Sequence, residues 1–312
     1  MKRWVGWCAG CVLVAGLFGQ QQPPPQQPAP ASDEPTRILV DVTRVSLLFT
    51  VQDKRGRFIT DLTKDDFEII ENRQHQVIQE FTAESDLPLR LGILIDTSNS
   101  IRDRFRFEQD AAIEFLRSTM RTRVDKALLV RFDERPELVA DLGDELGKLE
   151  AGIRGLHPGG GTALYDAIYF ACRDKLSLDQ PRTKFRRAIV IVSDGDDNES
   201  YYTRDQALEM AQKADVVLYP ISTNSSGAET DGDKILKYFA AETGGRAFFP
   251  FKVEDMAQSF ENISNELRHQ YNILYRPEPL VTDGLWHPIQ LRVKGRKDLI
   301  VRARTGYYAP KL

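Results

Sequence analysis

Two carboxylates and three hydroxyls along the chain are of the types that together bind one metal ion. They belong to Asp96, Ser98, Ser100, Thr162 and Asp194. All five are hard oxygen donors without a His or Cys among them, so the set favours Mg²⁺, Mn²⁺ or Ca²⁺ over zinc or copper. The two aspartates balance the charge of a divalent ion, and the weak neutral hydroxyls leave positions for water or an incoming carboxylate. The expected chemistry is binding of a cation that then contacts an acidic group.

These donors follow elements that would bring them to one edge of a sheet. The apolar segment LRLGILI runs into Asp96, and AIVIVS runs into Asp194. Continuous apolar segments of this length indicate buried parallel strands, and open parallel sheets bind ligands at the carboxyl ends of their strands. The loop that delivers Thr162 to the start of a helix contains three glycines, Gly159, Gly160 and Gly161.

Three pieces in this order, D-x-S-x-S, a glycine-rich loop with a threonine, and a strand followed by Ser-Asp-Gly, resemble the metal-ion-dependent adhesion site (MIDAS) of von Willebrand factor type A (vWA) domains, such as those of integrins. The resemblance covers residues 88–270, and all five donor positions match. It implies a Rossmann-like sheet, direct metal contacts by both serines and often the threonine, and water-mediated contacts by one or both aspartates. It also implies a protein partner that presents Asp or Glu.

The middle of the chain alternates buried strands with helical periodicity. Four apolar segments, LRLGILI, ALLVRF, AIVIVS and VVLYPIS, are interspersed with helical patterns at 104–119, 162–176, 204–214 and 253–268. This alternation predicts an α/β domain at residues 88–270, with a mostly parallel sheet and helices on both faces.

Both flanks show period-two strand patterns without helices between them. The alternation covers 45–51 and 67–69 on one side and 271–275, 289–293 and 299–303 on the other. We expect residues 38–87 and 271–312 to combine into one small β-sandwich into which the α/β domain is inserted. The alternative, two independent β appendages, would leave exposed edges on each. The segment LTKDDFEIIENRQHQVIQEF is similar to flanking strands of bacterial exported vWA proteins.

The N-terminus has the features of an export signal. Lys2 and Arg3 precede an apolar run at 4–18, and Gly19 offers a cleavage point. The run is shorter than the roughly 20 apolar residues that a membrane span needs. We therefore predict a signal peptide at 1–19, a Gln/Pro-rich linker at 20–37, and a periplasmic or extracellular protein. An uncleaved signal or a lipid on Cys11 remains the alternative route to a membrane.

Composition and motifs argue against several functions. The formal net charge is −4 and no basic segment is concentrated, so nucleic-acid binding has no support. The glycine loop lacks the Lys-Ser/Thr of a P-loop, which disfavours nucleotide binding. None of the four histidines stands in a recognisable triad, and a hydroxyl-rich magnesium site without a base has no evident route to activate water. We expect a non-enzyme, with a hydrolase as a distant alternative.

The expected function is that of an exported adhesion or scaffold module that binds a partner through the cation. In the alternative, the metal site only stabilises the fold and the β-sandwich binds the partner. Asp196, Asp197 and Glu199 are expected to form a solvated acidic rim beside Asp194. The sequence leaves open whether Tyr201 and Tyr202 contact a partner or only lead into a helix.

Overall fold

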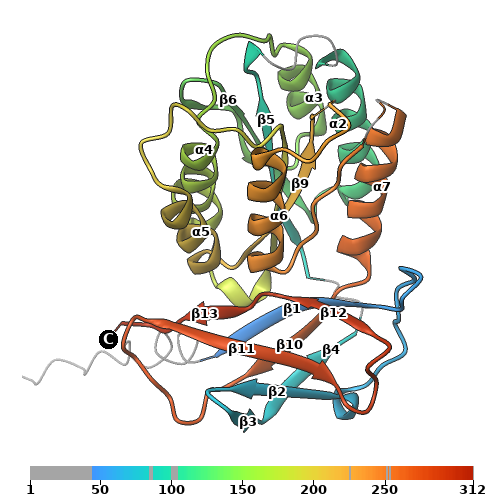
Figure 1. The fold of residues 1–312 in the computed structure, drawn as a ribbon, viewed down its shortest axis with the longest axis vertical. Coiled ribbons are helices and arrows are strands. Elements are labelled where there is room, and N and C mark those ends of the chain that lie inside the picture. Colours follow the sequence, from blue (N-terminus) through green and yellow to red (C-terminus); the bar gives the residue numbers. More distant parts are fainter. Residues whose placement is uncertain are drawn as a thin grey trace, which may run out of the picture. The chain divides into compact units, whose positions relative to one another are not determined.

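The computed structural model contains one five-stranded sheet with helices and two four-stranded sheets in the residues it describes (Figure 1). These are residues 44–83, 87–99, 105–224, 226–250, 252 and 254–311. The predicted signal peptide, the predicted linker and Ser100 lie outside them. In this described part, no helix is both long enough and apolar enough to cross a bilayer.

The five-stranded sheet is the centre of the α/β part. Its order is β7-β6-β5-β8-β9, with β7 antiparallel at the edge and the other strands parallel. Every residue of β5, β8 and β9 is buried, as the apolar runs predicted. The strands are β5 (Leu89–Asp96), β6 (Lys126–Phe132), β7 (Pro136–Gly143), β8 (Arg186–Ser193) and β9 (Val216–Ser222). The mostly parallel sheet is confirmed.

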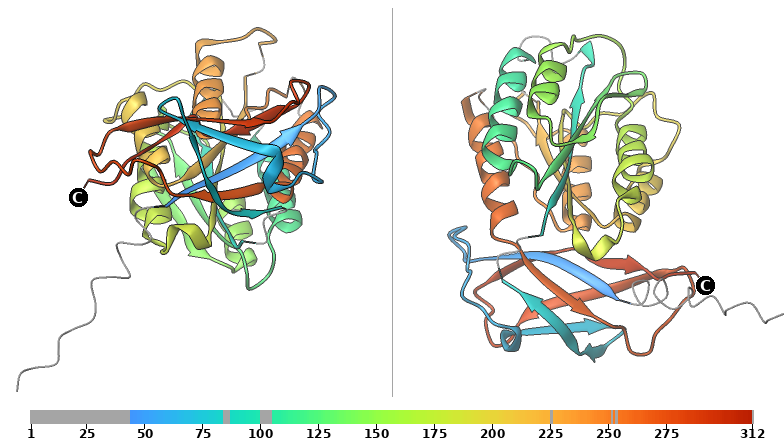
Figure 2. Two further views of the ribbon diagram at one scale, coloured as in Figure 1. Left: turned by 90° about the horizontal axis from the view of Figure 1, so that it is seen from below. Right: turned by 180° about the vertical axis from the view of Figure 1, so that it is seen from behind.

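Six α-helices in the described part cover the two faces of this sheet (Figures 1 and 2). Helices α2, α3 and α7 share a hydrophobic core with one face, and α4, α5 and α6 share a second core with the other. Their bounds are α2 (Phe105–Thr119), α3 (Leu146–Arg154), α4 (Leu164–Phe170), α5 (Arg204–Lys213), α6 (Asp231–Thr243) and α7 (Glu254–Arg268). Helix α4 continues into a π-helical turn, Ala171–Lys175. The predicted cover on both faces is confirmed.

Strands from both flanks of the chain form the two antiparallel sheets. One has the order β12-β1-β10-β4 and the other β13-β11-β2-β3. Their strands are β1 (Val45–Gln52), β2 (Phe67–Glu71), β3 (Gln74–Gln76), β4 (Ile78–Thr82), β10 (Tyr271–Tyr275), β11 (Trp286–Val293), β12 (Ile300–Ala303) and β13 (Gly306–Tyr308). In the first sheet, Leu47 lies opposite Ile273 and Val51 opposite Val301. One apolar core joins both sheets, so the single sandwich is confirmed and the two-appendage alternative is wrong.

The side chain of Arg186 is hydrogen-bonded to both segments of the chain that connect the sandwich to the α/β domain. Arg186 is the first residue of β8 and is buried. Its Nε donates to the carbonyl of Leu87 at 2.9 Å, and its Nη1 donates to the carbonyl of Leu267. The chain enters β5 just after Leu87 and reaches β10 just after Leu267, so one guanidinium ties both segments to the amino end of the central sheet.

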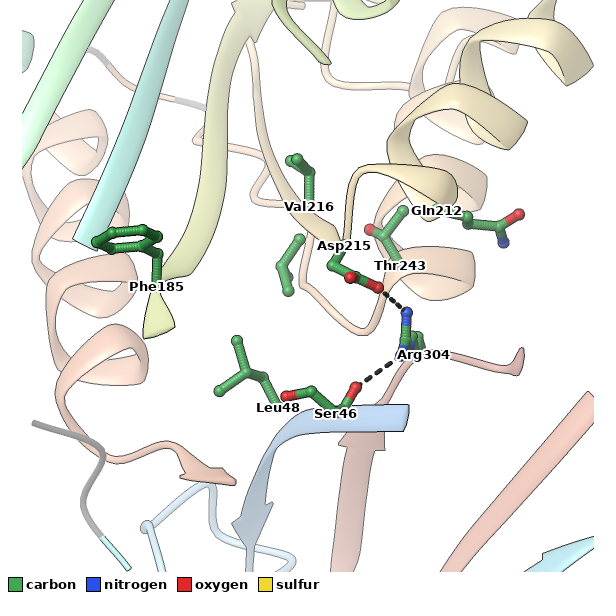
Figure 3. A pocket seen from close by; sticks show the side chains of 9 residues that line it. Ser46, Leu48, Phe185, Gln212, Asp215, Val216, Thr243 and Arg304 are labelled. Carbon is green, nitrogen blue, oxygen red and sulfur yellow. Dashed lines mark hydrogen bonds and ion pairs between the residues drawn. The ribbon is translucent and has the colours of Figure 1, made fainter. Parts of the chain in front are cut away.

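Arg304 makes a second link at this junction (Figure 3). It follows β12, donates to the carbonyl of Ser46 in β1 at 2.6 Å, and pairs with Asp215, which precedes β9. These side chains border a cavity of about 30 Å³ whose remaining walls are mainly apolar. A space of this size holds about one or two water molecules, so the cavity is a packing feature of the junction.

Glu266 is an ionisable group buried near the same junction. It lies in the last turn of α7 and is 1% exposed. Within the described structure, neither its Oε1 nor the Nε of Arg302 has a hydrogen-bond partner. Burial raises the pKa of Glu266 to about 7, and the charges of Arg302 and Arg246 act in the opposite direction. The negative charge of the ionised Glu266 carboxylate is therefore only partly balanced by neighbouring groups.

Candidate metal centre

Asp96 is fixed at the carboxyl end of β5 by two hydrogen bonds. It is the last residue of the strand and its side chain is fully buried. Its Oδ1 accepts the backbone N–H of Ser98 at 2.8 Å, and its Oδ2 accepts the hydroxyl of Ser193 at 2.8 Å. Because Ser193 ends the neighbouring strand β8, this second bond ties the two predicted motifs to each other.

Asp194 follows β8 in a turn that only glycine can complete. Gly195 has φ +84°, and a Cβ there would lie 2.3 Å from the carbonyl oxygen of Gly232 at the start of α6. The N–H of Gly195 donates to the Ser193 hydroxyl at 3.1 Å. Asp194 is partly exposed, and its Oδ1 accepts the N–H of Asp196 at 3.2 Å. The turn therefore leaves the Asp194 carboxylate at the surface of the same edge.

The glycine loop is bonded to the end of β5. The N–H of Gly159 donates to the carbonyl of Thr97 at 2.6 Å, and the side-chain amide of Asn99 donates to the carbonyl of Gly160 at 3.2 Å. Gly160 has φ +91°, and a Cβ on Gly161 would lie 2.7 Å from a carbon of Glu199. Gly160 and Gly161 thus occupy positions that disfavour a side chain, whereas no atom lies within 4 Å of a Cβ added at Gly159.

Thr162 is bonded to the loop that follows β8. Its N–H donates to Oδ1 of Asn198 at 2.9 Å, and its carbonyl accepts the N–H groups of Asn198 at 3.0 Å and Glu199 at 3.1 Å. Three separate segments are therefore joined around the predicted site. Four of the five predicted donors, Asp96, Ser98, Thr162 and Asp194, lie on these joined segments, and the fifth, Ser100, is outside the described residues.

The electrostatics of this edge favour a cation. Burial raises the pKa of Asp96 to about 6, hydrogen bonds from Ser98 and Ser193 oppose the shift, and the charge of Asp194 adds to it. A nearby cation favours the ionised form of a buried carboxyl. In the described residues, no three His, Cys, Asp or Glu side chains cluster in a way that could hold a metal. A metal at this edge would therefore depend on hydroxyls as well as on two carboxylates, and such oxygen donors suit Mg²⁺, Mn²⁺ or Ca²⁺.

The predicted acidic rim is only partly a rim. Asp196 and Glu199 are exposed, as expected, but the prediction is wrong for Asp197. The carboxylate of Asp197 accepts the N–H of Tyr165 at 2.9 Å and the hydroxyl of Ser200 at 2.6 Å. Asp197 is half-buried. It satisfies a free backbone N–H group in the first turn of α4, as short acidic side chains near the start of a helix do.

Two residues important to the geometry had no predicted role. Ser193 orients Asp96, and Asn198 holds the Thr162 loop. Ser193 was visible as the residue before Asp194 in the strand-Ser-Asp-Gly pattern, whereas nothing in the local sequence marks Asn198. Asp233, in the first turn of α6, is buried and accepts the hydroxyl of Ser222 at the end of β9 at 2.6 Å and the amide of Asn224 at 2.7 Å. These bonds satisfy Asp233 within the fold.

Comparisons with known proteins bear on the fold of the chain. Residues 91–196, a range that contains all five predicted donors, match the family model of the von Willebrand factor type A domain. A von Willebrand factor type A protein from Catenulispora acidiphila superposes with a TM-score of 0.52 at 12% identity, over 86% of this chain and 74% of that chain. Comparison with curated proteins gave no match.

Proximal thread matrix protein 1 from the mussel byssus is also similar in structure. It superposes with a TM-score of 0.53 at 14% identity, over 64% of this chain and 51% of that chain. A second structure of the mussel protein, with a zinc-occupied MIDAS motif, gives a TM-score of 0.52 at 14% identity, over 63% and 50%. The match thus spans about half of the mussel protein, and at this identity the similarity concerns the fold alone.

Proposed function

Because the chain contains a von Willebrand factor type A domain, we propose that this domain binds one divalent cation and holds an acidic residue of a partner protein through it. The proposed ligands are Asp96, Ser98, Ser100, Thr162 and Asp194, and the expected ion is Mg²⁺ or Mn²⁺. The main support is the hydrogen-bond network that joins the ends of β5 and β8 to the Thr162 loop.

The proposed ligand set explains why a partner would supply a carboxylate. Asp96 and Asp194 together offer two negative charges, which a divalent ion balances, and the remaining donors are neutral hydroxyls. Such an ion has weak ligands and keeps positions for another oxygen. A Glu or Asp of the partner would complete the coordination, and binding would then require both the cation and that acid.

The proposal includes export and a non-enzymatic role. Export rests on the charged start, the short apolar run and the Gln/Pro-rich linker of the sequence, and N-terminal sequencing of the envelope fraction tests it; a chain that still begins at Met1 in the cytoplasm would contradict it. Of the four histidines, His75 and His287 are part of the sandwich and His269 stacks on Phe58 next to it. The fourth, His157, is exposed and lies two residues before Gly159, so the non-enzymatic role rests on the absence of a recognisable triad in the sequence.

Metal binding is tested by isothermal titration of the mature protein with Mg²⁺ and Mn²⁺. We expect one ion per chain in the wild type and none in Asp194→Ala. Asp196→Ala is the matched control, because it removes an exposed carboxylate two residues away and should retain the ion. Absence of uptake by the wild type would reject the site, and normal uptake by Asp194→Ala would reject that ligand.

Partner binding is tested by capture from a cell-envelope extract, followed by mass spectrometry, in Mg²⁺ and in EDTA. We expect capture by the wild type in Mg²⁺, none in EDTA, and none by Asp194→Ala. Thr162→Ala should weaken partner binding more than metal binding. If all forms capture the same partner in EDTA, the metal has only a structural role, and the β-sandwich surface becomes the better candidate.

A further inference from the structure

Three buried polar atoms lie where helix α7 meets the sandwich, and none has a hydrogen-bond partner in the described part of the chain. They are Oγ1 of Thr50 in β1, Nε of Arg302 in β12 and Oε1 of Glu266 in α7. Thr50 and Arg302 are directly opposite each other in their sheet, and the Thr50 hydroxyl is near enough to Glu266 to stabilise its ionised form. Buried polar groups are nearly always paired, so three unpaired atoms at one interface require an explanation.

The charged and titratable groups around Glu266 come from the elements packed against it. Arg302 lies in β12, Arg246 lies between α6 and α7, and Tyr219 lies in β9. Burial raises the pKa of the Glu266 carboxyl to about 7, although the charges of Arg302 and Arg246 lower it. Burial, and then the charge of Glu266, raise the pKa of Tyr219, so this phenol stays neutral and cannot balance the carboxylate. The ionised carboxylate is therefore the less stable form in this closed interface.

The two forms of Glu266 fit different arrangements of the interface. A neutral carboxyl can stay buried between α7 and the pair of Thr50 and Arg302, because it carries no charge that needs solvation. An ionised carboxylate and the Nε–H of Arg302 are both satisfied by water, which reaches them only if α7 separates from β1 and β12. A local opening of this kind requires less free energy than unfolding of the whole chain.

Two other links join the sandwich to the opposite face of the central sheet. Arg304 pairs with Asp215, which precedes β9, and the hydroxyl of Thr305 donates to Glu242 of α6 at 2.7 Å. Helix α6 packs on one face of the sheet and α7 on the other. These two links can therefore remain while the α7 side of the interface opens.

We infer that Glu266 makes this interface acid-dependent: the protonated carboxyl keeps α7 packed on β1 and β12, and the ionised carboxylate opens that side while the sandwich and the α/β domain each stay folded. Above neutral pH the α/β domain then turns relative to the sandwich about the contacts of Arg304 and Thr305. The inference rests on this interface alone and does not require the proposed metal site.

A thiol placed in the interface tests this in the full mature chain. Thr50→Cys puts the thiol at a position that is 2% exposed, and Cys172, buried in the core that α4 shares with the sheet, reports unfolding of the α/β domain. Labelling with a maleimide at pH 6 and at pH 8 is followed by mass spectrometry, and each rate is divided by the rate of a short peptide with the same thiol. We expect about a tenfold rise at the introduced thiol, because the carboxyl has its ordinary pKa of 4.5 in the open form and a pKa of about 7 in the closed form. Cys172 should stay unlabelled at both pH values.

Three further variants in the same background assign the rise to Glu266. Glu266→Gln should remove it, because an amide cannot ionise, whereas Glu261→Gln, which removes an exposed carboxyl of the same helix, should keep it. Arg302→Gln should move the rise to higher pH, because it removes a charge that lowers the pKa of Glu266. A merely structural effect of Arg302→Gln would instead speed labelling equally at every pH. Absence of the rise, a rise that persists in Glu266→Gln, or equal labelling of Cys172 would overturn the inference.

Discussion

The two ends of the central sheet differ in how their charges are satisfied. At the amino ends of the strands, the side chains of Arg186 and Arg304 donate to backbone carbonyls at the junction with the sandwich. At the carboxyl ends, Asp96 is held by neutral donors, and no Lys, Arg or His in the described part of the chain pairs with it or with Asp194. At the first end the two arginines bind groups of the chain itself, while the second end keeps negative charge in a fixed geometry and suits an external cation.

Gly195→Ala, at the carboxyl end of the central sheet, should cause the largest loss of stability. An alanine at this position would have an unfavourable φ of +84°, and its Cβ would clash with the carbonyl oxygen of Gly232, so the backbone must move. We expect the free energy of unfolding, measured by denaturant titration, to fall by about 4–5 kcal/mol, with loss of metal uptake. Gly147→Ala in α3 is the control, because no atom lies within 4 Å of its added Cβ. It should gain about 0.5–1 kcal/mol. A Gly195→Ala protein of wild-type stability would refute the account of this turn.

Arg186→Ala tests the amino end. Removing the guanidinium leaves the carbonyls of Leu87 and Leu267 without this donor at a buried position. We expect the free energy of unfolding to fall by about 3–4 kcal/mol, while metal affinity of the folded protein is unchanged. Arg44→Ala, which breaks the surface pair with Glu80, should change stability little. A loss of metal affinity in folded Arg186→Ala would show that the two ends are not independent.

Glu266 at the amino end should contribute to the pH dependence of stability, in addition to Asp96 at the carboxyl end, whose pKa burial also raises. Below its ordinary pKa of 4.5, the carboxyl is protonated in folded and unfolded chains alike. As the pH rises to about 7, the folded chain keeps a proton that the unfolded chain has released, so the free energy of unfolding decreases, by about 3 kcal/mol in total. Glu266→Gln should remove this decrease in denaturant titrations at several pH values. An unchanged pH profile in the variant would exclude Glu266 as its source.

Ser193→Ala should have the smallest effect, a loss of metal affinity. It tests the hydrogen bond to Asp96 at the carboxyl end of the central sheet. Loss of the bond to Asp96 should weaken metal binding about tenfold with the fold retained, because partners of metal ligands typically contribute this much. Ser222 is its register partner on β9 and donates in the same way to Asp233. Ser222→Ala should leave metal affinity unchanged in isothermal titration. Equal affinities for the two variants would mean that Ser193 has no special part in the site.

The sequence predicted the elements with a clear apolar run or period, and missed β7, α3 and α6. The segments that became β5, β8 and β9 are continuous apolar runs, and the fold covers every residue in them. The edge strand β7 was missed because its PELVADLG segment is only partly buried and has no such run. Helices α3 and α6 were missed as well, although Thr230 and Asp233 form a capping box at the start of α6.

The sequence indicated a list of candidate donors but not the geometry that surrounds them. Motif order and strand ends indicated Asp96, Thr162 and Asp194, since short-range patterns record where strands end. The bonds that hold them depend on residues such as Asn198, which is 36 positions from Thr162, and no local pattern encodes that pairing. The half-buried state of Asp197 was unpredictable for the same reason, because it depends on where the start of α4 lies in space.

The pairing of β1 with β10 has a consequence for the order in which the protein matures. The hydroxyl of Ser46 donates to Asn272, 226 residues later, and β1 has its neighbours in the sheet only on strands that follow the whole α/β domain. During synthesis, β1 must therefore wait while the intervening domain, whose contacts are more local, has the opportunity to fold first. A ribosome that stalls before Tyr271 would leave β1 without its partner strands β10 and β12, so the sandwich can be completed only after the whole α/β domain has been synthesised.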